Sequence, residues 1–326
     1  MTITWHVNYL KISHVDPFQV TKICQYLASI YGKGKVHDYL DMDLNFALDG
    51  IVQMSMITHT SKIISNFPEK LASSCTLSVG YHLFTVCAAL EAKILPEEQV
   101  QAFHHTVDQL LFLCKWTCKD IQTAVSFLTT GVECPNKDNW GKLKQVLRYL
   151  HSTHHMKLNL VAHNLTTIWW WADASHTTHK DWPRHMGAVM FLGKGATISF
   201  SNKLKINTKF STKSELVGAS QAFSSILHTC YFIEAQSYSV EQNTLFQDSQ
   251  FTMRLEANGM FSSSKCTKHI KCRYFIISNT INDGNLEVIT CPTEIMWVHV
   301  LTKSKQGGPF CLDCSILMNV PINYNN

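Results

Sequence analysis

The first half of the chain alternates short strand-like stretches with segments of helical periodicity. Alternating apolar and polar positions flank Asn8 and Tyr9 in TITWHVNYLKISHVD, which predicts a hairpin. Residues 16–34 repeat apolar positions with a helical period and end in glycines, which predicts a helix. A second alternating stretch turns at Asp49-Gly50, which predicts another hairpin. Three further helices are expected near residues 96–113, 119–130 and 139–150.

From about residue 151 the pattern changes to strands followed by alternating helices and strands. KLNLVAHNLTTIWWWADAS is strand-like, and GAVMFLGKGATISFSNK predicts a hairpin that turns at residues 193–195. A long helix is expected from Ser211, where Ser211 or Thr212 is placed to cap its start. NTLFQDSQ predicts a strand running into a helix, KCTKHIKCRYFIISNTI a helix, GNLEVITC a strand and TEIMWVHVLTK a final helix. This order predicts a mixed α/β fold around one sheet.

Composition allows two ordinary domains and sets few limits on function. The chain has 326 residues, of which 45% are hydrophobic, and its net charge of +4 permits an anionic partner without requiring one. No apolar run approaches the roughly 18 residues of a membrane helix, and the N-terminus lacks a signal-peptide pattern. We therefore expect an intracellular protein, cytoplasmic or nuclear, with no membrane partner.

The 12 cysteines are scattered, and in a reducing compartment we expect free thiols. Cys311 and Cys314 alone have ligand spacing, in CLDC, and a single such pair is a poor zinc site. Zinc binding there is kept as a third interpretation. The histidines of LHSTHHMKL are interpreted as a polar helix end.

Three acidic residues stand at the edges of otherwise apolar segments. Asp173 closes the strand TIWWWAD, Glu215 lies in the first turns of the long helix, and Asp248 ends LFQD. Carboxylates that converge from separate elements bind hard divalent cations, and a pair of such ions can catalyse in-line attack on a phosphodiester. Because the chain has 24 acidic residues, many other triples exist, and this pattern alone identifies no function.

The segments around these acids resemble the ribonuclease H domain of copia-type retrotransposon polyproteins. WADASHTTHKD, STKSELVGAS, FQDSQ, TKHIKCRYF and VHVLTK agree with it in order and spacing over roughly residues 165–308. Upstream, FHHTVDQLLFLCKWTCKDIQTAVSFLTT and WGKLKQVLRYLHST are similar to the helices that follow the reverse transcriptase palm in the same polyproteins. The resemblance thus covers nearly the whole chain.

The resemblance implies three parts. Residues 1–150 would be a truncated α+β remnant of the reverse transcriptase palm and connection, with an open sheet edge. Residues 151–308 would form a ribonuclease H-like domain, a mixed five-stranded sheet flanked by helices. Residues 309–326 would be a C-terminal tail.

The resemblance also implies a catalytic metal site. Asp173, Glu215 and Asp248 would hold Mg²⁺ or Mn²⁺, and the family's fourth acid, in the motif ADILTK, falls at His299 in VHVLTK. Imidazole is a softer ligand without negative charge, so weaker Mg²⁺ binding is expected. Lys213 replaces a nearby acid and would compete with the cations. The alternative for His299 is a tolerated residue on a partly exposed helix.

An RNA–DNA hybrid is the partner that the resemblance implies, and an intact retrotransposon polyprotein is a second. Basic residues would contact the phosphates, although a solvated surface is the alternative for them. The candidates are Lys203, Lys205, Lys209, Lys268, His269, Lys271 and Arg273, together with Lys265.

The opening hairpin resembles the polymerase hairpin of the family, which carries a Tyr-Val-Asp-Asp motif. In HVNYLKISH, Asn8 and Tyr9 occupy the two aspartate positions. An amide and a phenol cannot hold the metal pair that polymerisation needs. We therefore expect polymerase activity to be lost.

Two classes of function follow from these observations. The first is a ribonuclease H-like protein that binds RNA–DNA hybrids with weak or absent cleavage. The second is not enzymatic: a nucleic-acid-binding or interaction protein, or an inert relic. Cysteines at 118 and 266, where the family has arginine, suggest a decaying element copy.

Overall fold

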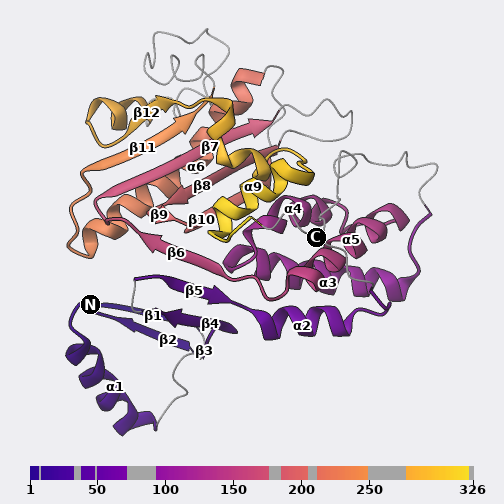
Figure 1. Cartoon of the computed structure of the whole chain (residues 1–326), viewed down its shortest axis with the longest axis horizontal. Helices are drawn as coiled ribbons and strands as arrows, with labels where there is room; N and C mark the ends of the chain where they lie inside the picture. The colour runs from indigo at the N-terminus through magenta and orange to yellow at the C-terminus, as the bar shows by residue number, and fades with distance from the viewer. Residues whose placement is uncertain are drawn as a thin grey trace.

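The computed structural model describes residues 1–6, 9–32, 38–47, 50–71, 93–175, 185–204, 211–248 and 277–322. Within these ranges the side chains of residues 4–10, 38–39 and 211–217 are not described. The described residues form two five-stranded sheets with helices packed between and around them, and a two-stranded hairpin at the N-terminus (Figure 1).

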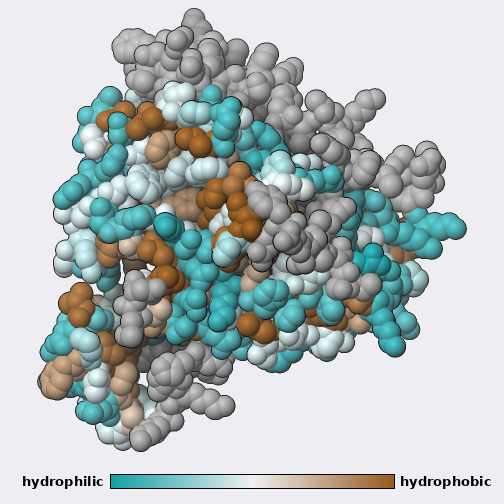
Figure 2. Space-filling model, in the orientation of Figure 1, coloured by the Kyte–Doolittle hydropathy of each residue, from teal (hydrophilic) through white to brown (hydrophobic). Residues whose placement is uncertain are grey.

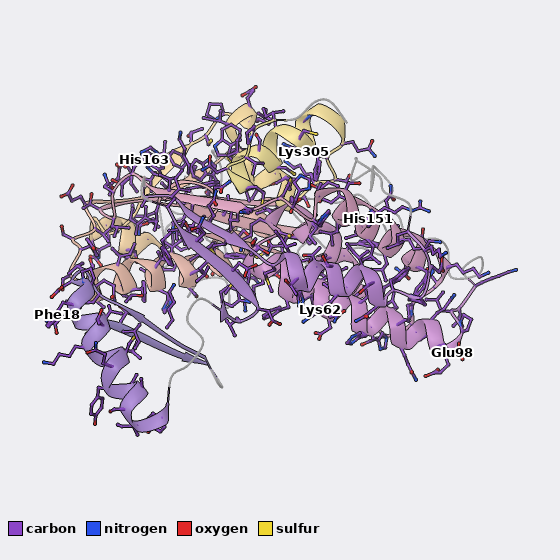
Figure 3. All side chains as sticks on the ribbon, turned by 60° about the horizontal axis from the view of Figure 1, so that its bottom comes forward. Phe18, Lys62, Glu98, His151, His163 and Lys305 are labelled. Atoms are coloured by element: carbon purple, nitrogen blue, oxygen red, sulfur yellow. The ribbon has the colours of Figure 1, made fainter. Side chains whose placement is uncertain are left out.

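The N-terminal hairpin is a two-stranded sheet of its own that contacts β3. Strands β1 (Thr2–His6) and β2 (Tyr9–Ser13) pair antiparallel, as predicted, and helix α1 (Pro17–Tyr31) follows. Asp16 caps α1 by accepting a hydrogen bond from the backbone N–H of Phe18. No residue of α1 is buried, and Phe18, which Figure 3 labels, is exposed together with Tyr26, Ile30 and Tyr31. Figure 2 shows the resulting apolar surface on this helix.

One sheet is antiparallel and joins the two halves of the chain. Its strands are ordered β3-β4-β5-β6-β9, where β4 pairs with β5 as the second predicted hairpin. Strand β6, from the segment assigned to the second domain, pairs with β5 of the first. The sheet therefore crosses the predicted domain boundary. The bounds are β3 (Asp38–Tyr39), β4 (Met42–Phe46), β5 (Val52–Ser55), β6 (Leu158–Ala162) and β9 (Gly193–Lys194).

A layer of helices contains the largest apolar cluster. The three helices expected after residue 95 are present, and the middle one begins with a 3₁₀ turn, η1. Asn136 caps α5 in a capping box with Asn139. None of the described helices is long and apolar enough to cross a membrane. The bounds are α2 (Ile57–Asn66), α3 (Glu97–Trp116), η1 (Lys119–Ile121), α4 (Gln122–Thr130) and α5 (Lys137–Thr153).

The second sheet is mixed, as predicted, with order β10-β8-β7-β11-β12. Strands β7, β8 and β10 are antiparallel neighbours, whereas β11 runs parallel to both β7 and β12. The bounds are β7 (Thr167–Ser175), β8 (His185–Phe191), β10 (Ile198–Lys203), β11 (Gln242–Gln247) and β12 (Glu287–Thr290).

Both faces of this sheet are covered, which explains why β8 is buried along its whole length. One face packs against helix α6 (Ser211–Ala235), and Trp170 and Ile226 belong to the apolar cluster on this face. Because side chains alternate along a strand, Trp171 and Asp173 lie on the other face. There Trp171 joins the same cluster as Leu301 and residues of α4.

The C-terminal region differs from the prediction in its helices. A single helix over TEIMWVHVLTK is wrong: Met296, at φ −81° and ψ 78°, separates the 3₁₀ helices η3 (Thr293–Ile295) and η4 (Trp297–Leu301). Within the segment expected to be a C-terminal tail, residues 309–326, helix α9 (Gly307–Met318) buries Phe310, Cys314 and Leu317 in the main apolar cluster.

Candidate metal centre at one edge of the mixed sheet

Two of the predicted acids lie at the same edge of the mixed sheet. Because β7 and β11 are parallel, their carboxyl ends meet at this edge. Asp173 lies in β7, two residues before the strand ends, and Asp248 directly follows β11. Strand β10 also ends here, at the exposed Lys203. The fold thus brings together Asp173 and Asp248, as predicted.

His299 completes a three-residue cluster. Its Nε2 lies 3.4 Å from Asp248 Oδ2 and 3.8 Å from Asp173 Oδ2. The side chains of His299 and Asp173 are 4% and 6% exposed, and that of Asp248 is 28% exposed. The alternative interpretation placed His299 on a partly exposed helix, whereas the residue is buried. Among the described residues, this is the group of histidine, cysteine and acidic side chains placed to hold a metal ion.

A glycine allows the segment that carries His299 to approach the sheet. Gly187 in β8 is the cross-strand partner of Asp173. A Cβ at this glycine would lie 2.8 Å from Leu301 Cβ and 2.8 Å from Thr302 Cγ2, closer than real Cβ atoms come. The missing side chain therefore makes room for η4 beside Asp173.

Thr302 and Lys303 act directly on Asp173, and sequence reasoning did not single them out. The Thr302 hydroxyl donates a 2.6 Å hydrogen bond to Asp173 Oδ2, and Lys303 Nζ lies 3.5 Å from the same oxygen. Thr302 is fully buried, whereas the Lys303 side chain is 44% exposed. Both belong to the family-like segment VHVLTK, so that segment was the available signal.

Two carboxyl groups that His299 influences have shifted pKa values, for different reasons. Contact with the His299 ring lowers the pKa of Asp248, with burial opposing and Lys303 assisting. Burial raises the pKa of Asp313 in α9, although the ion pair with Lys305, at 2.5 Å, opposes this. Lys305 lies just before α9 (Figure 3). Sequence reasoning missed this pair because it expected a tail here.

Glu215 lies on the helix that passes the end of β7. A Cβ at Gly218 of α6 would be 3.1 Å from Ala174 Cβ and 3.9 Å from the Asp173 carbonyl oxygen, so the helix backbone runs close to Asp173. Glu215 is three residues earlier in the same helix. Its side chain, like that of Lys213, is outside the described side chains, and its role as a ligand stays a prediction.

Most of the residues predicted to contact phosphates, and both polymerase positions, lack a described side chain. Asn8 lies outside the described residues, and Tyr9 is described in backbone only, as the first residue of β2. Lys203 is at the sheet edge of the metal cluster. The remaining basic candidates, Lys205, Lys209, Lys265, Lys268, His269, Lys271 and Arg273, lie outside the described residues.

Zinc binding through CLDC gains no support from the described part of the chain. Cys314 is buried in the main apolar cluster, and Cys311 lies one turn away on the same helix. Across the described ranges, the metal-ligand cluster contains no cysteine.

The mixed five-stranded sheet, with an acid–histidine cluster at the carboxyl ends of β7 and β11, has the arrangement that the resemblance predicts for a ribonuclease H-like domain. No family model matches the chain. The Pol polyprotein of transposon TNT 1-94 from Nicotiana tabacum is 24% identical over 278 residues, covering 83% of this chain and 20% of that protein. The putative transposon Ty5-1 protein of Saccharomyces cerevisiae is 26% identical over 226 residues, covering 67% of this chain and 71% of that protein. The Pol polyprotein of transposon RE2 from Arabidopsis thaliana is 27% identical over 190 residues, or 58% of this chain.

These relatives show that the chain is homologous to the Pol polyproteins of copia-type transposons. It spans about a fifth of the tobacco polyprotein. Among solved structures, foamy viral protease–reverse transcriptase in complex with an RNA/DNA hybrid gives a TM-score of 0.48 at 11% identity, over 89% of this chain and 36% of that one. LC11-RNase H1 isolated from compost gives 0.28 at 12% identity, over 42% of this chain and 93% of that one.

Proposed function

We propose that this chain is a retrotransposon-derived ribonuclease H-like protein that binds RNA–DNA hybrids and cleaves their RNA strand at best weakly. The cluster of Asp173, Asp248 and His299 carries the proposal, because it places a metal-binding donor set at the sheet edge where the resemblance expects the nuclease site. The homology to transposon Pol polyproteins supports the same substrate class.

The two aspartates fit a divalent cation because carboxylate oxygens are hard donors. Thr302 would hold the Asp173 carboxylate in a fixed orientation through its 2.6 Å hydrogen bond. Glu215, one turn from the point where α6 meets β7, would be the third carboxylate ligand. Two divalent metal ions held by these carboxylates would supply an activated water and would stabilise the charge that develops on the attacked phosphate. Lys203, at the same sheet edge, would contact the phosphates of the hybrid.

Two features argue for low activity. His299 stands at the position of the family's fourth acid, so the site has fewer negative charges to hold Mg²⁺. Lys303 Nζ, 3.5 Å from Asp173, competes with a cation for the same oxygen. Polymerase activity is proposed to be lost because Asn8 and Tyr9 replace its aspartates. We place the protein inside the cell, where it would meet hybrids or an intact retrotransposon polyprotein.

Cleavage of an end-labelled RNA–DNA hybrid by the purified chain, in Mg²⁺ and separately in Mn²⁺, tests the proposal. We expect slow cleavage that is stronger in Mn²⁺ and is abolished in Asp173→Asn, a variant of nearly unchanged shape. His299→Asp restores the family's acid, so it should raise the Mg²⁺-dependent rate. Activity that survives Asp173→Asn would come from a contaminating nuclease and would contradict the proposal.

The alternative, a non-catalytic nucleic-acid-binding protein, is favoured by the Lys303–Asp173 contact, which fills part of the site with an internal cation. Folded protein that binds the hybrid with strong salt dependence but never cleaves it, even with His299→Asp, would select this alternative. Folded protein that neither binds nor cleaves would leave only the inert relic.

A further inference from the structure

His299 buries its Nε2 atom against two carboxylates. Among the described residues, no hydrogen bond of ordinary geometry reaches its Nε2, and the atom is shielded from solvent. Instead it faces carboxylate oxygens of Asp248 and Asp173 at 3.4 and 3.8 Å. Buried polar atoms normally have close partners, and 3.4 Å is longer than an ordinary N–H···O hydrogen bond, so an ion held between these atoms would satisfy all three.

The spacing of these three atoms suits a small ion with short bonds. Zinc–nitrogen and zinc–oxygen bonds of about 2.0–2.2 Å in tetrahedral geometry separate neighbouring ligand atoms by roughly 3.4 Å. The His299–Asp248 separation is 3.4 Å, and the His299–Asp173 separation of 3.8 Å needs only a small inward movement. All three ligand atoms lie within 4.8 Å of one another.

The donor types decide between classes of metal. Mg²⁺ prefers oxygen ligands in near-ideal octahedral geometry and keeps several waters, so an imidazole suits it poorly. Imidazole suits late first-row ions, whose affinities exceed those of earlier ions of the same row. We infer that His299, Asp173 and Asp248 form a site that prefers borderline ions of the Zn²⁺ and Co²⁺ class over Mg²⁺. This inference rests on the proposed function because it concerns the same site.

The surrounding residues are compatible with such an ion. Thr302 orients Asp173 from outside the ligand set, as supporting residues do in metal sites. Lys303 is the competing cation, but its side chain is 44% exposed and can move into solvent. The same ion would offset the repulsion between the carboxylates of Asp173 and Asp248.

Metal titration of the whole, metal-free chain without nucleic acid tests the inference. Co²⁺ binding is followed by visible absorption, and Zn²⁺ and Mg²⁺ binding by calorimetry. We expect one Co²⁺ site that Zn²⁺ displaces, with Mg²⁺ binding at least about a hundredfold weaker. Thiolate ligands would add an intense near-ultraviolet band, and its absence separates this site from the cysteines. A signal that persists unchanged in Asp248→Asn would overturn the assignment.

The preference itself is tested by replacing the nitrogen donor with oxygen. His299→Asp and His299→Asn should each lower the ratio of Zn²⁺ to Mg²⁺ affinity by at least about tenfold. His151→Asp makes the same change at an exposed histidine of α5 and should leave the ratio unaltered. An unchanged ratio in either folded His299 variant, or Mg²⁺ binding as tight as Zn²⁺ in the original chain, would show that the inference is wrong. The metal titrations contain no RNA–DNA hybrid, so a failure to cleave the hybrid in the other assay would not change their result.

Discussion

At the scale of single residues, the candidate site is defined by one change of donor type. The resemblance predicts a fourth carboxylate, and the chain has His299 there instead. Because this imidazole is buried between two aspartates, the change alters the chemistry of the site and not only its surface. Thr302 then becomes important, since it is the described hydroxyl that donates to Asp173.

Thr302→Val removes this hydroxyl while keeping the side-chain shape. We expect Co²⁺ affinity to fall about 10–100-fold because Asp173 loses the group that orients it. Thr302→Ser keeps the donor and loses only the methyl group, so its Co²⁺ affinity should stay within about threefold of the original. Absorption titrations of both variants measure this. Equal losses in the two would mean that methyl packing, not the hydrogen bond, supports the site.

At the scale of elements, the site depends on how closely η4 lies against β8. Leu301 and Thr302 occupy the space where a side chain of residue 187 would be. The hydroxyl of Thr123 in α4 also donates a 2.6 Å hydrogen bond to the Val300 carbonyl, which holds η4 from its other side. The short helix is therefore fixed between β8 and α4.

Gly187→Ala should push η4 away from Asp173. A Cβ there would come within 2.8 Å of Leu301 and Thr302, so we expect the free energy of unfolding to fall by about 1–3 kcal/mol. Co²⁺ affinity should fall with it, because His299 and Thr302 both move. Chemical denaturation and the Co²⁺ titration measure the two effects.

The matched control is Gly141→Ala, in the middle of α5. A Cβ at Gly141 meets nothing within 4 Å, so alanine should raise the free energy of unfolding by about 1 kcal/mol through helix propensity. Its Co²⁺ affinity should not change. If Gly187→Ala kept both stability and Co²⁺ affinity, the close approach of η4 would not be what builds the site.

The elements that carry the two aspartates were predictable, and the one that carries His299 was not. WWWAD and LFQD are apolar runs ended by an acid, which is how strands covered on both faces appear in a sequence. TEIMWVHVLTK has helix-like spacing, but Met296 leaves the helical region and η4 is shaped by its packing on β8. Helix α9 begins with two glycines and no capping side chain, so only its tertiary packing reveals it.

At the scale of the whole molecule, buried polar contacts join the helical layer to the mixed sheet. The side chains of Gln122 in α4 and Ser199 in β10 are hydrogen-bonded at 2.7 Å, and Gln122 also donates to the Ser199 carbonyl. Ser201 donates to the Leu301 carbonyl at 2.7 Å, and His185 Nε2 lies 2.5 Å from Ser201 Oγ. With β6 pairing to β5 as well, we expect the parts on either side of residue 150 to unfold together.

His185 makes these buried polar contacts between the helical layer and the mixed sheet, called the seam below, sensitive to acid. Burial lowers the pKa of His185 from 6.5 to about 4, so the unfolded chain takes up the proton at a higher pH than the folded chain. Its stabilising effect is therefore complete above pH 6.5 and is lost as the pH falls toward about 4. Between pH 7 and pH 5 this group alone should lower the free energy of unfolding by about 2 kcal/mol. Urea unfolding of the original chain and of His185→Gln at both pH values measures it.

The quantity to compare between variants is the fall in the free energy of unfolding from pH 7 to pH 5, not the stability at either pH. His185→Gln removes the titrating group, so its stability should fall less between pH 7 and pH 5, even if repacking makes it less stable at both. Burial also lowers the pKa of His59, so part of the acid sensitivity should remain in this variant. His151→Gln, at an exposed site, should keep the full slope of the original chain. Parallel curves for His185→Gln and the original chain would show that a charged His185 is tolerated inside the seam, and that the seam is open to water.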